Sequence, residues 1–596
     1  MRSRFSRSLY VGRQTVTRGM APIIACVAKT LPRNQEVAAQ FELLADLLEI
    51  EGYDAFRVLA YRRAAALIRD TAGSIAQLAL DGKAKQLQGI GKTIEGKIVE
   101  IVDDGEVHAL TKHKGIVPPD VVAFTRLPGL GPKTARKIWK DLGVTTVQEL
   151  RKAAEAQRLR TLSGLGAKLE ESVLKALDEA KPEAVVSDRP LLGTALPAVL
   201  DAVETLRAHP AAVKVSEAGS ARRRRETVRD LDIIATATDA ETLIAHFVEL
   251  PWVVDVAAKG GTKATVLSAQ GLRFDLRVVP PECYGNLLQH FTGSKHHNVA
   301  MREEAVRHGF SVSEYGVKIV ETGEVVTHAE EAELYEFLGY QFIPPELREN
   351  LGELEAARLG ALPELVELRD LKGDLHAHTT WSADGKNTAE EMALACKQRG
   401  YRYLAVTDHS HYLREGRMEA QDRELAALNE KLAPFRLLKG VEANIKADGT
   451  IDVPDETLAT REWVIASLHT SFDKNPTERV LGAMENPHVD CIGHLTGRKI
   501  GKRPGAAVDV ERVIEKALET GTVLEIDSQP DRLDMPDAVA RLAGEASVPI
   551  AVTSDAHRIS ALDYVGIGIG QARRAWLTKA HVVNTRTWPQ IAKLRR

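Results

Sequence analysis

Two aspartates separated by a single residue, Asp230 and Asp232, begin an apolar run that is typical of a strand. Because side chains alternate along a strand, both carboxylates point to one face while Leu231 and Ile233 point into a core. Asp275 lies in a second run with the same alternation, which predicts a third carboxylate on the polar face of a neighbouring strand. Three such acids can hold two divalent cations that clamp the attacking and leaving oxygens in phosphoryl transfer. The alternative is a half-buried sheet whose acids face the solvent.

A Gly-Ser turn and four consecutive arginines, from Gly219 to Arg225, precede these acids. A turn of small residues lets backbone amides approach a phosphate, and Arg222 or Arg223 supplies the charge that a triphosphate requires. The turn, the arginines, the paired acids and the later strand acid follow in one order. This order favours a catalytic site over a solvated sheet.

This constellation resembles the nucleotidyltransferase palm of family X DNA polymerases. The resemblance implies that the three aspartates bind two Mg²⁺ or Mn²⁺ ions. It also implies that Gly219, Ser220 and Arg223 hold the phosphates of an incoming deoxynucleoside triphosphate. Arg224 departs from the family pattern, because many members have glycine at this position.

The match continues in a segment that contacts the sugar and base of the nucleotide in relatives. The resemblance implies that Phe291 and Gly293 pack on the deoxyribose. It further implies that Asn298 reaches the base edge and that Arg302 touches the template side. Many relatives have tyrosine where this chain has His290, so discrimination against ribonucleotides is left open.

Beyond Leu371 the sequence contains seven apolar runs that each finish on a metal-competent side chain, several of them separated by helical stretches. The runs end at His376 with His378, His409, Glu442, His469, His494, Asp527, and Asp555 with His557. Parallel strands that alternate with helices close into a barrel whose active site lies at the carboxyl ends of the strands. So many endings in one segment favour a shared polynuclear metal site over separate structural histidines.

This stretch resembles the polymerase-and-histidinol-phosphatase (PHP) domain, a distorted seven-stranded barrel that holds up to three manganese or zinc ions. The resemblance assigns nine metal ligands: His376, His378, Asp384, His409, Glu442, His469, His494, Asp555 and His557. It implies hydrolysis by a metal-activated water that attacks phosphorus, with Arg498 steadying the phosphate. Asn444 replaces an aspartate that is more frequent in relatives, and the loop before Asp384 is one residue longer than usual.

A Gly-aliphatic-Gly motif recurs three times before the palm, each time followed by a short helix with Lys or Arg. Its glycines are Gly89 and Gly91, Gly129 and Gly131, and Gly164 and Gly166. The pattern predicts helix-hairpin-helix modules whose free amides and positive helix ends contact DNA phosphates without reading bases. The alternative is a helical bundle with glycine turns. Lys97 matches the lyase lysine of some relatives, but Thr93 replaces a basic neighbour, so we expect no lyase activity.

Composition and length set the remaining limits. The chain has 596 residues, 44% hydrophobic and 27% charged, and a formal net charge of −4, so a nucleic-acid partner must meet local basic patches. The four cysteines show no C-x-x-C spacing, which argues for a reducing compartment. No apolar run approaches the roughly 20 residues of a membrane span.

The resulting prediction is a multidomain protein: α-helical helix-hairpin-helix modules, an α+β nucleotidyltransferase palm with a thumb, and a distorted (β/α)7 PHP barrel. The predicted segments are a disordered extension (1–33, with Met20 as an alternative start), a small helical DNA-binding domain (34–112), a fingers-like domain (113–184), the palm (185–285), the thumb (286–350), a linker (351–370) and the PHP domain (371–596).

The predicted function is a DNA polymerase that fills short gaps in base excision repair, joined to a metal-dependent 3′-5′ exonuclease. Abasic-site incision and removal of 3′-phosphates are variants of the second activity. The alternative is a DNA-binding metallo-phosphoesterase or AP endonuclease whose polymerase half no longer synthesises, and a third possibility is a DNA-bridging scaffold. Expected partners are gapped or primer-template DNA and deoxynucleoside triphosphates. We expect a cytoplasmic, nucleoid-associated monomer without a membrane partner.

Overall fold

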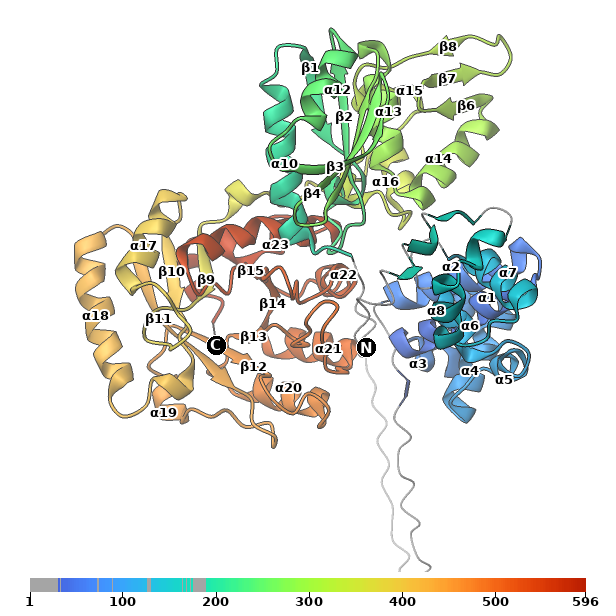
Figure 1. Cartoon of the computed structure of the whole chain (residues 1–596). Coiled ribbons are helices and arrows are strands. Elements are labelled where there is room, and N and C mark those ends of the chain that lie inside the picture. The colour runs from blue at the N-terminus through green and yellow to red at the C-terminus, as the bar shows by residue number, and fades with distance from the viewer. Residues whose placement is uncertain are drawn as a thin grey trace, which may run out of the picture. The chain divides into compact units, whose positions relative to one another are not determined.

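A computed structural model of the chain divides into two compact units, residues 1–69 with 75–173, and residues 70–74 with 174–596 (Figure 1). It describes residues 31–595 except 33, 72–73, 88, 126–129, 163–164, 168, 172 and 175–188. The predicted extension therefore lies almost entirely outside the described residues.

The first unit is helical throughout its described residues. Its elements are α1 (Asn34–Glu51), α2 (Ala55–Asp70), α3 (Ile75–Leu80), η1 (Ala84–Gln86), α4 (Lys92–Asp104), α5 (His108–Lys114), α6 (Pro119–Phe124), α7 (Pro132–Leu142), α8 (Val147–Glu155) and η2 (Leu159–Thr161). Two of the repeated glycines, Gly91 and Gly131, stand directly before α4 and α7. The repeat therefore marks helix starts.

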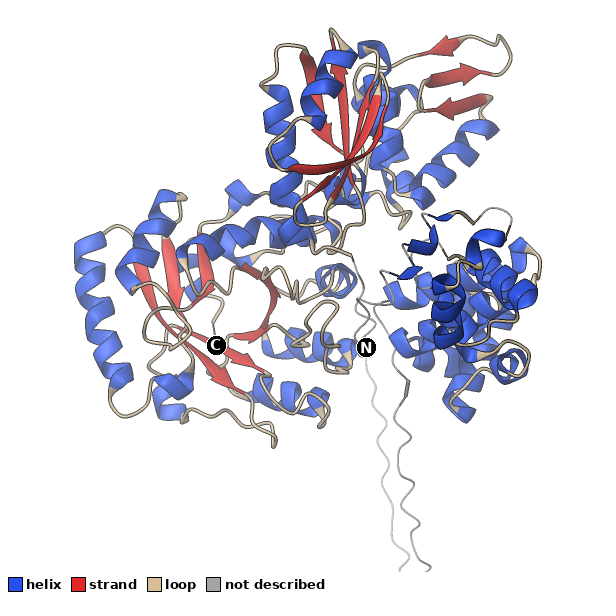
Figure 2. Cartoon of the chain, viewed as in Figure 1, coloured by secondary structure: helices blue, strands red, loops and turns tan. Residues whose placement is uncertain are grey.

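The second unit begins with a five-stranded sheet in the order β1-β2-β5-β4-β3, the palm (Figure 2). Its elements are α10 (Leu192–Arg207), β1 (Ala212–Glu217), α11 (Gly219–Arg222), β2 (Leu231–Ala237), α12 (Ala240–Val248), β3 (Val253–Lys259), β4 (Lys263–Ser268) and β5 (Arg273–Val278). The alternating apolar residues of β2 and β5, such as Ile233 and Leu276, are fully buried in the palm core. Strands β2 and β5 are the parallel pair of this sheet.

The thumb follows the palm and carries a small sheet, β6-β7-β8. Its elements are η3 (Pro281–Cys283), α13 (Tyr284–Thr292), α14 (Lys295–Arg307), β6 (Phe310–Ser313), β7 (Gly316–Ile319), β8 (Val325–Val326), α15 (Glu331–Phe337) and η4 (Pro345–Leu347). The predicted linker contains α16 (Glu353–Arg358) and η5 (Leu368–Asp370). Glu353 is fully buried and accepts a hydrogen bond from the His297 ring at 2.7 Å, so this connector packs into the thumb.

The C-terminal region contains seven parallel strands in sequence order. They are β9 (Gly373–Ala377), β10 (Tyr403–Val406), β11 (Arg436–Asn444), β12 (Trp463–Ser467), β13 (Cys491–Gly493), β14 (Val523–Asp527) and β15 (Ile550–Thr553). A parallel bridge between Ala377 and Ala556 brings the first and last strands together. The seven apolar runs are thus seven strands of a nearly closed barrel, and the predicted fold class is confirmed.

Helices lie around the outside of these strands (Figure 1). They are α17 (Ala389–Gln398), η6 (Ser410–Tyr412), α18 (Arg417–Leu432), α19 (Asp455–Leu458), α20 (Pro476–Glu485), α21 (Val510–Thr520), α22 (Asp537–Glu545), η7 (Ile559–Tyr564), α23 (Val565–Arg574), η8 (Val583–Thr585) and α24 (Trp588–Ala592). All seven strands contribute to one buried cluster that also includes Trp588 and Ile591 of α24. The C-terminal helix therefore closes the end of the barrel where the strands begin.

The palm and the barrel share a hydrophobic core. Leu533 and Ile567 of the barrel belong to the buried cluster of the palm. A Cβ atom on Gly193 of α10 would lie 2.2 Å from Pro530, so the backbone of one domain touches the other. Among the described helices, none is long and apolar enough to cross a membrane.

Candidate active sites

The three palm aspartates come together at the start of two neighbouring strands, β2 and β5. Asp232 on β2 and Asp275 on β5 are register partners in the parallel pair, and Asp230 directly precedes β2. Arg273 Nε lies 3.1 Å from Asp275 Oδ2 and 3.7 Å from Asp230 Oδ1, so a single cation reaches both carboxylates. Burial, followed by the charges of Asp275 and Asp230, raises the pKa of Asp232 to about 7. This crowding of negative charge fits a site for divalent cations.

Gly219 lies against the same acids and has no room for a side chain. Its φ is +61°, and a Cβ atom there would lie 2.2 Å from Asp232 Oδ2. Only glycine accepts both the left-handed backbone and this close approach. The predicted Gly-Ser turn therefore brings the backbone directly beside the carboxylates.

The arginines after this turn have different partners. Arg222 forms a bidentate pair with Glu331 of α15 at 2.6 and 2.9 Å. Arg223 Nε lies 3.0 Å from Glu349 Oε1, and Arg223 Nη1 donates to the Thr292 carbonyl. Arg222 therefore joins palm to thumb, whereas Arg223 lies beside the thumb segment that is predicted to contact the nucleotide.

Arg224 has a φ of +56°, a left-handed backbone conformation that glycine adopts more readily than arginine. Its Nη1 donates to the Ala221 carbonyl at 2.8 Å, and its Nη2 lies 3.3 Å from Glu217. Its Cβ lies 2.9 Å from where a Cβ on Gly570 of α23 would be placed. The departure from glycine therefore adds a palm contact to the barrel.

The predicted sugar and base contacts form one hydrogen-bonded group at the start of the thumb. Asn298 Nδ2 donates to the His290 carbonyl, and Gln289 Nε2 donates to Asn298 Oδ1, both at 2.8 Å. Arg302 Nη2 donates to His290 Nδ1 at 2.7 Å, while the Arg277 guanidinium lies 4.4 Å from the Phe291 ring centre. Burial and Arg302 lower the pKa of His290, so its ring accepts this bond as a neutral group.

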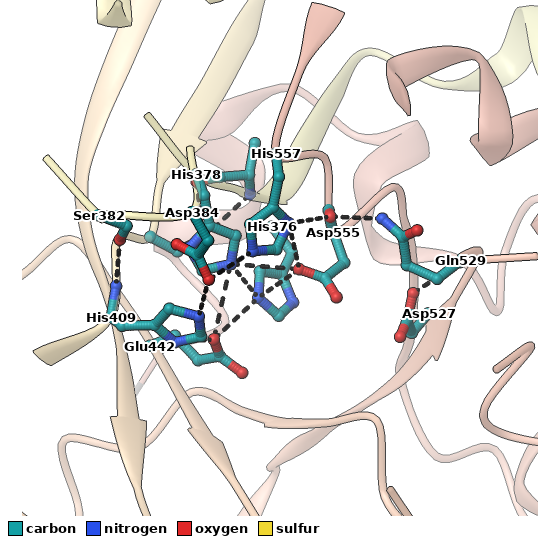
Figure 3. Close-up of polar contacts among 12 residues, drawn as sticks. His376, His378, Ser382, Asp384, His409, Glu442, Asp527, Gln529, Asp555 and His557 are labelled. Carbon is teal, nitrogen blue, oxygen red and sulfur yellow. Dashed lines mark hydrogen bonds and ion pairs between the residues drawn. The ribbon is translucent and has the colours of Figure 1, made fainter. Parts of the chain in front are cut away.

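The second site surrounds Glu442, at the carboxyl ends of the barrel strands (Figure 3). Glu442 Oε1 lies 3.0 Å from His494 Nε2 and 3.2 Å from His469 Nε2. Its Oε2 lies 2.8 Å from His409 Nδ1 and 3.6 Å from His376 Nε2. Residues from four strands and their following loops thus meet at one carboxylate.

The other predicted ligands complete this group. Asp555 Oδ1 lies 3.2 Å from His378 Nε2. Asp384 Oδ2 lies 3.4 Å from both His409 Nε2 and His557 Nε2, so the longer loop still delivers its carboxylate (Figure 3). The structure therefore brings all nine predicted residues together.

The donor set fits transition metals. Three overlapping triads have ligand atoms within 4.8 Å of one another: His378, His409 and His557; His376, His378 and Glu442; and His409, Glu442 and His469. Burial lowers the pKa of His378 to about 3, which keeps its ring neutral and its lone pair available. Mixed imidazole and carboxylate ligands suit zinc and manganese.

Two residues outside the predicted ligand set orient the histidines. Glu525 Oε1 accepts a hydrogen bond from His376 Nδ1 at 2.7 Å, and Glu525 Oε2 accepts one from the His494 amide at 2.7 Å. Asn444 Oδ1 pairs with His469 Nδ1 at 2.6 Å, a contact that an aspartate oxygen at this position would also make. Glu525 lies two residues before Asp527 on β14, so the two side chains point to the same face of the strand. This alternation could have identified Glu525 from the sequence.

Replacing Glu525 by glutamine should weaken metal binding to the barrel by about 10- to 100-fold, because a glutamine amide has one acceptor oxygen and cannot accept from both the His376 ring and the His494 amide. Equilibrium titration of the full chain with Mn²⁺ measures this affinity without any assay of activity. Glu511→Gln, at an exposed position on α21, is the matched control and should bind Mn²⁺ normally. Equal Mn²⁺ affinities for the two variants would contradict the orienting role.

A cavity of about 340 Å³ opens beside the nine ligands. Four cations line it, Lys386, Lys499, Arg532 and Arg558, together with Gln529 and the ligands Asp384, Asp555 and His557. Sequence reasoning missed these cations because they come from separate loops. Arg498, the residue predicted to bind phosphate, is not in this lining: it donates to the Arg532 carbonyl and to Glu226 of the palm, each at 2.7 Å.

Two of the described hairpin glycines lie at open helix starts. Gly91 and Gly131 are the N-caps of α4 and α7, and no atom lies within 4 Å of a Cβ placed on either residue. Gly89 has a φ of +105°, and a Cβ on it would lie 3.3 Å from the Leu67 side chain, whereas no atom lies within 4 Å of a Cβ on Gly166. Gly129 and Gly164 lie outside the described residues.

Comparisons with known proteins agree with both halves of this arrangement. Family models match as follows: a helix-hairpin-helix domain at residues 32–107, a SAM-like helix-hairpin-helix tandem at 122–179, the DNA polymerase beta thumb at 287–349 and the PHP domain at 374–527.

Relatives point the same way. Two shorter ones are probable phosphatases, from Caldanaerobacter subterraneus (34% identical, covering 31% of this chain and 75% of that protein) and Thermoanaerobacter sp. strain X514 (30%, covering 36% and 89%). The DNA polymerase/3′-5′ exonuclease PolX of Bacillus subtilis is 40% identical over 570 residues, which cover 94% of this chain and 98% of that protein. Because this last match spans nearly the whole of both chains, the chain belongs to the PolX family of DNA polymerases that carry a PHP domain.

Proposed function

We propose that this chain is a DNA polymerase with a 3′-5′ exonuclease, and that each activity has its own metal site. The observation that carries the proposal is the presence of two separate groups of ligands in one chain. One consists of the carboxylates of Asp230, Asp232 and Asp275, and the other consists of Glu442 and the eight other barrel ligands. The relative from Bacillus subtilis bears the name of both activities.

In the palm, the three aspartates would hold two Mg²⁺ or Mn²⁺ ions. The ions supply charge neutralisation of the phosphates and activation of the 3′ hydroxyl. Asp275 is the acid assigned to the ion beside the attacking hydroxyl, and Asp230 and Asp232 would help to hold both ions. Gly219, at the start of α11, and Ser220 offer backbone and hydroxyl donors to the phosphates, and Arg223 adds a guanidinium.

In the barrel, the nine ligands would hold up to three Mn²⁺ or Zn²⁺ ions, which supply the activated water and the electrophilic clamp for phosphodiester hydrolysis. Glu525 and Asn444 hold His376 and His469 so that their Nε2 atoms face the centre. The four cations of the cavity place positive charge beside the ligands Asp384, Asp555 and His557, where a DNA phosphate would bind. We therefore assign strand binding to the cavity cations.

The double variant Lys386→Met with Arg558→Met should raise the KM for DNA degradation about tenfold, because two phosphate contacts are lost. Both side chains are exposed, so folding should be unaffected. The slope of log KM against log salt concentration should also become shallower. Lys397→Met, at an exposed position on α17, is the control, and an unchanged KM and salt slope in the double variant would exclude the cavity as the strand site.

The helix-hairpin-helix unit would hold gapped or primer-template DNA through its open helix starts. Filling of short gaps in base excision repair is a role that suits such a unit in one chain with a palm.

Template-directed insertion of a labelled deoxynucleotide into a one-nucleotide gap tests the polymerase half. Failure to extend with either Mg²⁺ or Mn²⁺ would favour the alternative, a DNA-binding phosphoesterase or AP endonuclease. Substrates with an intact 3′ hydroxyl, a 3′-phosphate or an abasic site separate the three possible reactions of the barrel.

A further inference from the structure

A buried arginine of the barrel, Arg574 at the end of α23, contacts the polymerase half of the chain. Its side chain is only 3% exposed. Within the barrel, its Nε donates to Asp537 at 2.8 Å. Beyond the barrel, its Nη1 lies 2.9 Å from both Glu349 Oε1 and the Arg223 carbonyl oxygen. One guanidinium therefore joins α22, the end of the thumb and the palm turn.

Glu349 is shared between two arginines. Its Oε1 atom accepts from Arg574 Nη1 at 2.9 Å and from Arg223 Nε at 3.0 Å. Burial alone would raise the pKa of the Glu349 carboxyl, but Arg574 and Arg223 outweigh burial and hold this pKa at about 2. The carboxylate is therefore charged at neutral pH, and its position depends on both guanidinium groups.

These contacts fix Arg223 at both ends. Its carbonyl accepts a hydrogen bond from Arg574, and its guanidinium pairs with the carboxylate that Arg574 also holds. The Nη1 atom of Arg223 reaches the Thr292 carbonyl and lies 3.3 Å from where a Cβ on Gly293 would be placed. Arg223 thus lies beside the segment that is proposed to contact the sugar, in an orientation that the barrel helps to set.

We propose that Arg574 is a positioning residue for nucleotide binding in the polymerase site, acting through Glu349 and the backbone of Arg223. The inference rests on the proposed role of Arg223 as a phosphate ligand. Arg574 itself touches neither nucleotide nor metal. Since the interaction strengthens binding of the triphosphate, its loss appears in the KM for the deoxynucleotide rather than in the rate of degradation by the barrel.

The neighbouring Arg573 provides a matched control. It lies on the same helix and pairs with Glu346 at 2.8 Å. Because Glu346 is three residues before Glu349 in the sequence, Arg573 also links the barrel to the end of the thumb. The Arg573 guanidinium donates to Glu346 and to the Val366 carbonyl. Arg573→Gln therefore removes an ion pair between the same two segments without affecting the contacts of the phosphate arginine.

The test uses the full chain with Arg574→Gln, Glu349→Gln, both together, and Arg573→Gln. Single-nucleotide gap filling gives kcat and KM for the deoxynucleotide, Mn²⁺-dependent degradation reports on the barrel, and Tm reports on stability. We expect Arg574→Gln and Glu349→Gln to raise KM about tenfold each, and the double variant to raise it less than the product of the two. Degradation should keep its rate, and Arg573→Gln should lower Tm without changing KM.

Arg574→Lys serves as a second variant if Arg574→Gln does not fold, because lysine keeps the charge but cannot span Asp537, Glu349 and the Arg223 carbonyl together. An unchanged KM in the folded variant, or the same KM change in Arg573→Gln, overturns the proposal. Arg223→Gln distinguishes the proposed phosphate-binding role of Arg223 from the proposed positioning role of Arg574. If it leaves KM unchanged, the assigned role of Arg223 is wrong; if it raises KM while Arg574→Gln does not, only the positioning role fails.

Discussion

Asp275→Asn is expected to reduce nucleotide insertion by on the order of 10³-fold or more while leaving Mn²⁺-dependent DNA degradation unchanged. Asp275 is the register partner of Asp232 across β2 and β5, and its charge is one of the two that raise the pKa of Asp232. Asparagine keeps the shape of the side chain but removes the charge that would hold a cation beside the attacking hydroxyl. The loss should therefore appear mainly in kcat.

Single-turnover insertion into a one-nucleotide gap measures this effect directly. Asp255→Asn, at an exposed position on β3 of the same sheet, is the control and should insert at the normal rate. A variant at Asp275 that kept its insertion rate would show that the carboxylate is not part of the polymerase site. A parallel loss of degradation would show that the two sites are not independent.

The double substitution His376→Ala with His378→Ala should have the opposite effect. The two histidines and Glu442 form one of the three potential metal-binding triads, and His378 also belongs to a second one. Removing both should lower DNA degradation by on the order of 10³-fold or more, since a bound metal contributes several kcal/mol to such a reaction. Gap filling should continue at the normal rate.

Metal analysis of the purified double variant provides a second measurement, because the barrel should lose bound manganese or zinc whether or not it is assayed for degradation. His488→Ala, at a half-buried position outside the ligand set, is the matched control and should keep both metal and activity. Full degradation by the double variant would exclude the barrel centre as the hydrolytic site.

The alternation of apolar and polar residues along the sequence predicted the palm acids, because alternate side chains of a strand point to the same face of the sheet. Asp232 and Asp275 each follow the alternation of their own strand, and the parallel pairing of β2 with β5 then sets them side by side. Most barrel ligands were visible because each apolar run ended close to the carboxyl end of its strand. Asp384, on the loop between β9 and α17, was assigned only from the family resemblance.

Contacts between segments that are distant in the sequence could not be predicted from a local sequence pattern. The Arg498 side chain reaches Glu226, 272 residues away in sequence, so its local setting after His494 gave no indication of a palm partner. The cavity cations and the Arg574 network also depend on how separate loops pack. Arg224 could be explained only once its positive φ was visible.

The most direct test of two separate metal sites is anomalous diffraction from crystals of the full chain soaked in Mn²⁺. We predict manganese peaks at two distinct places, one among Asp230, Asp232 and Asp275, and one around Glu442. Absence of manganese from either group of ligands, in crystals of an active enzyme, would contradict the assignment of one metal-dependent reaction to each site.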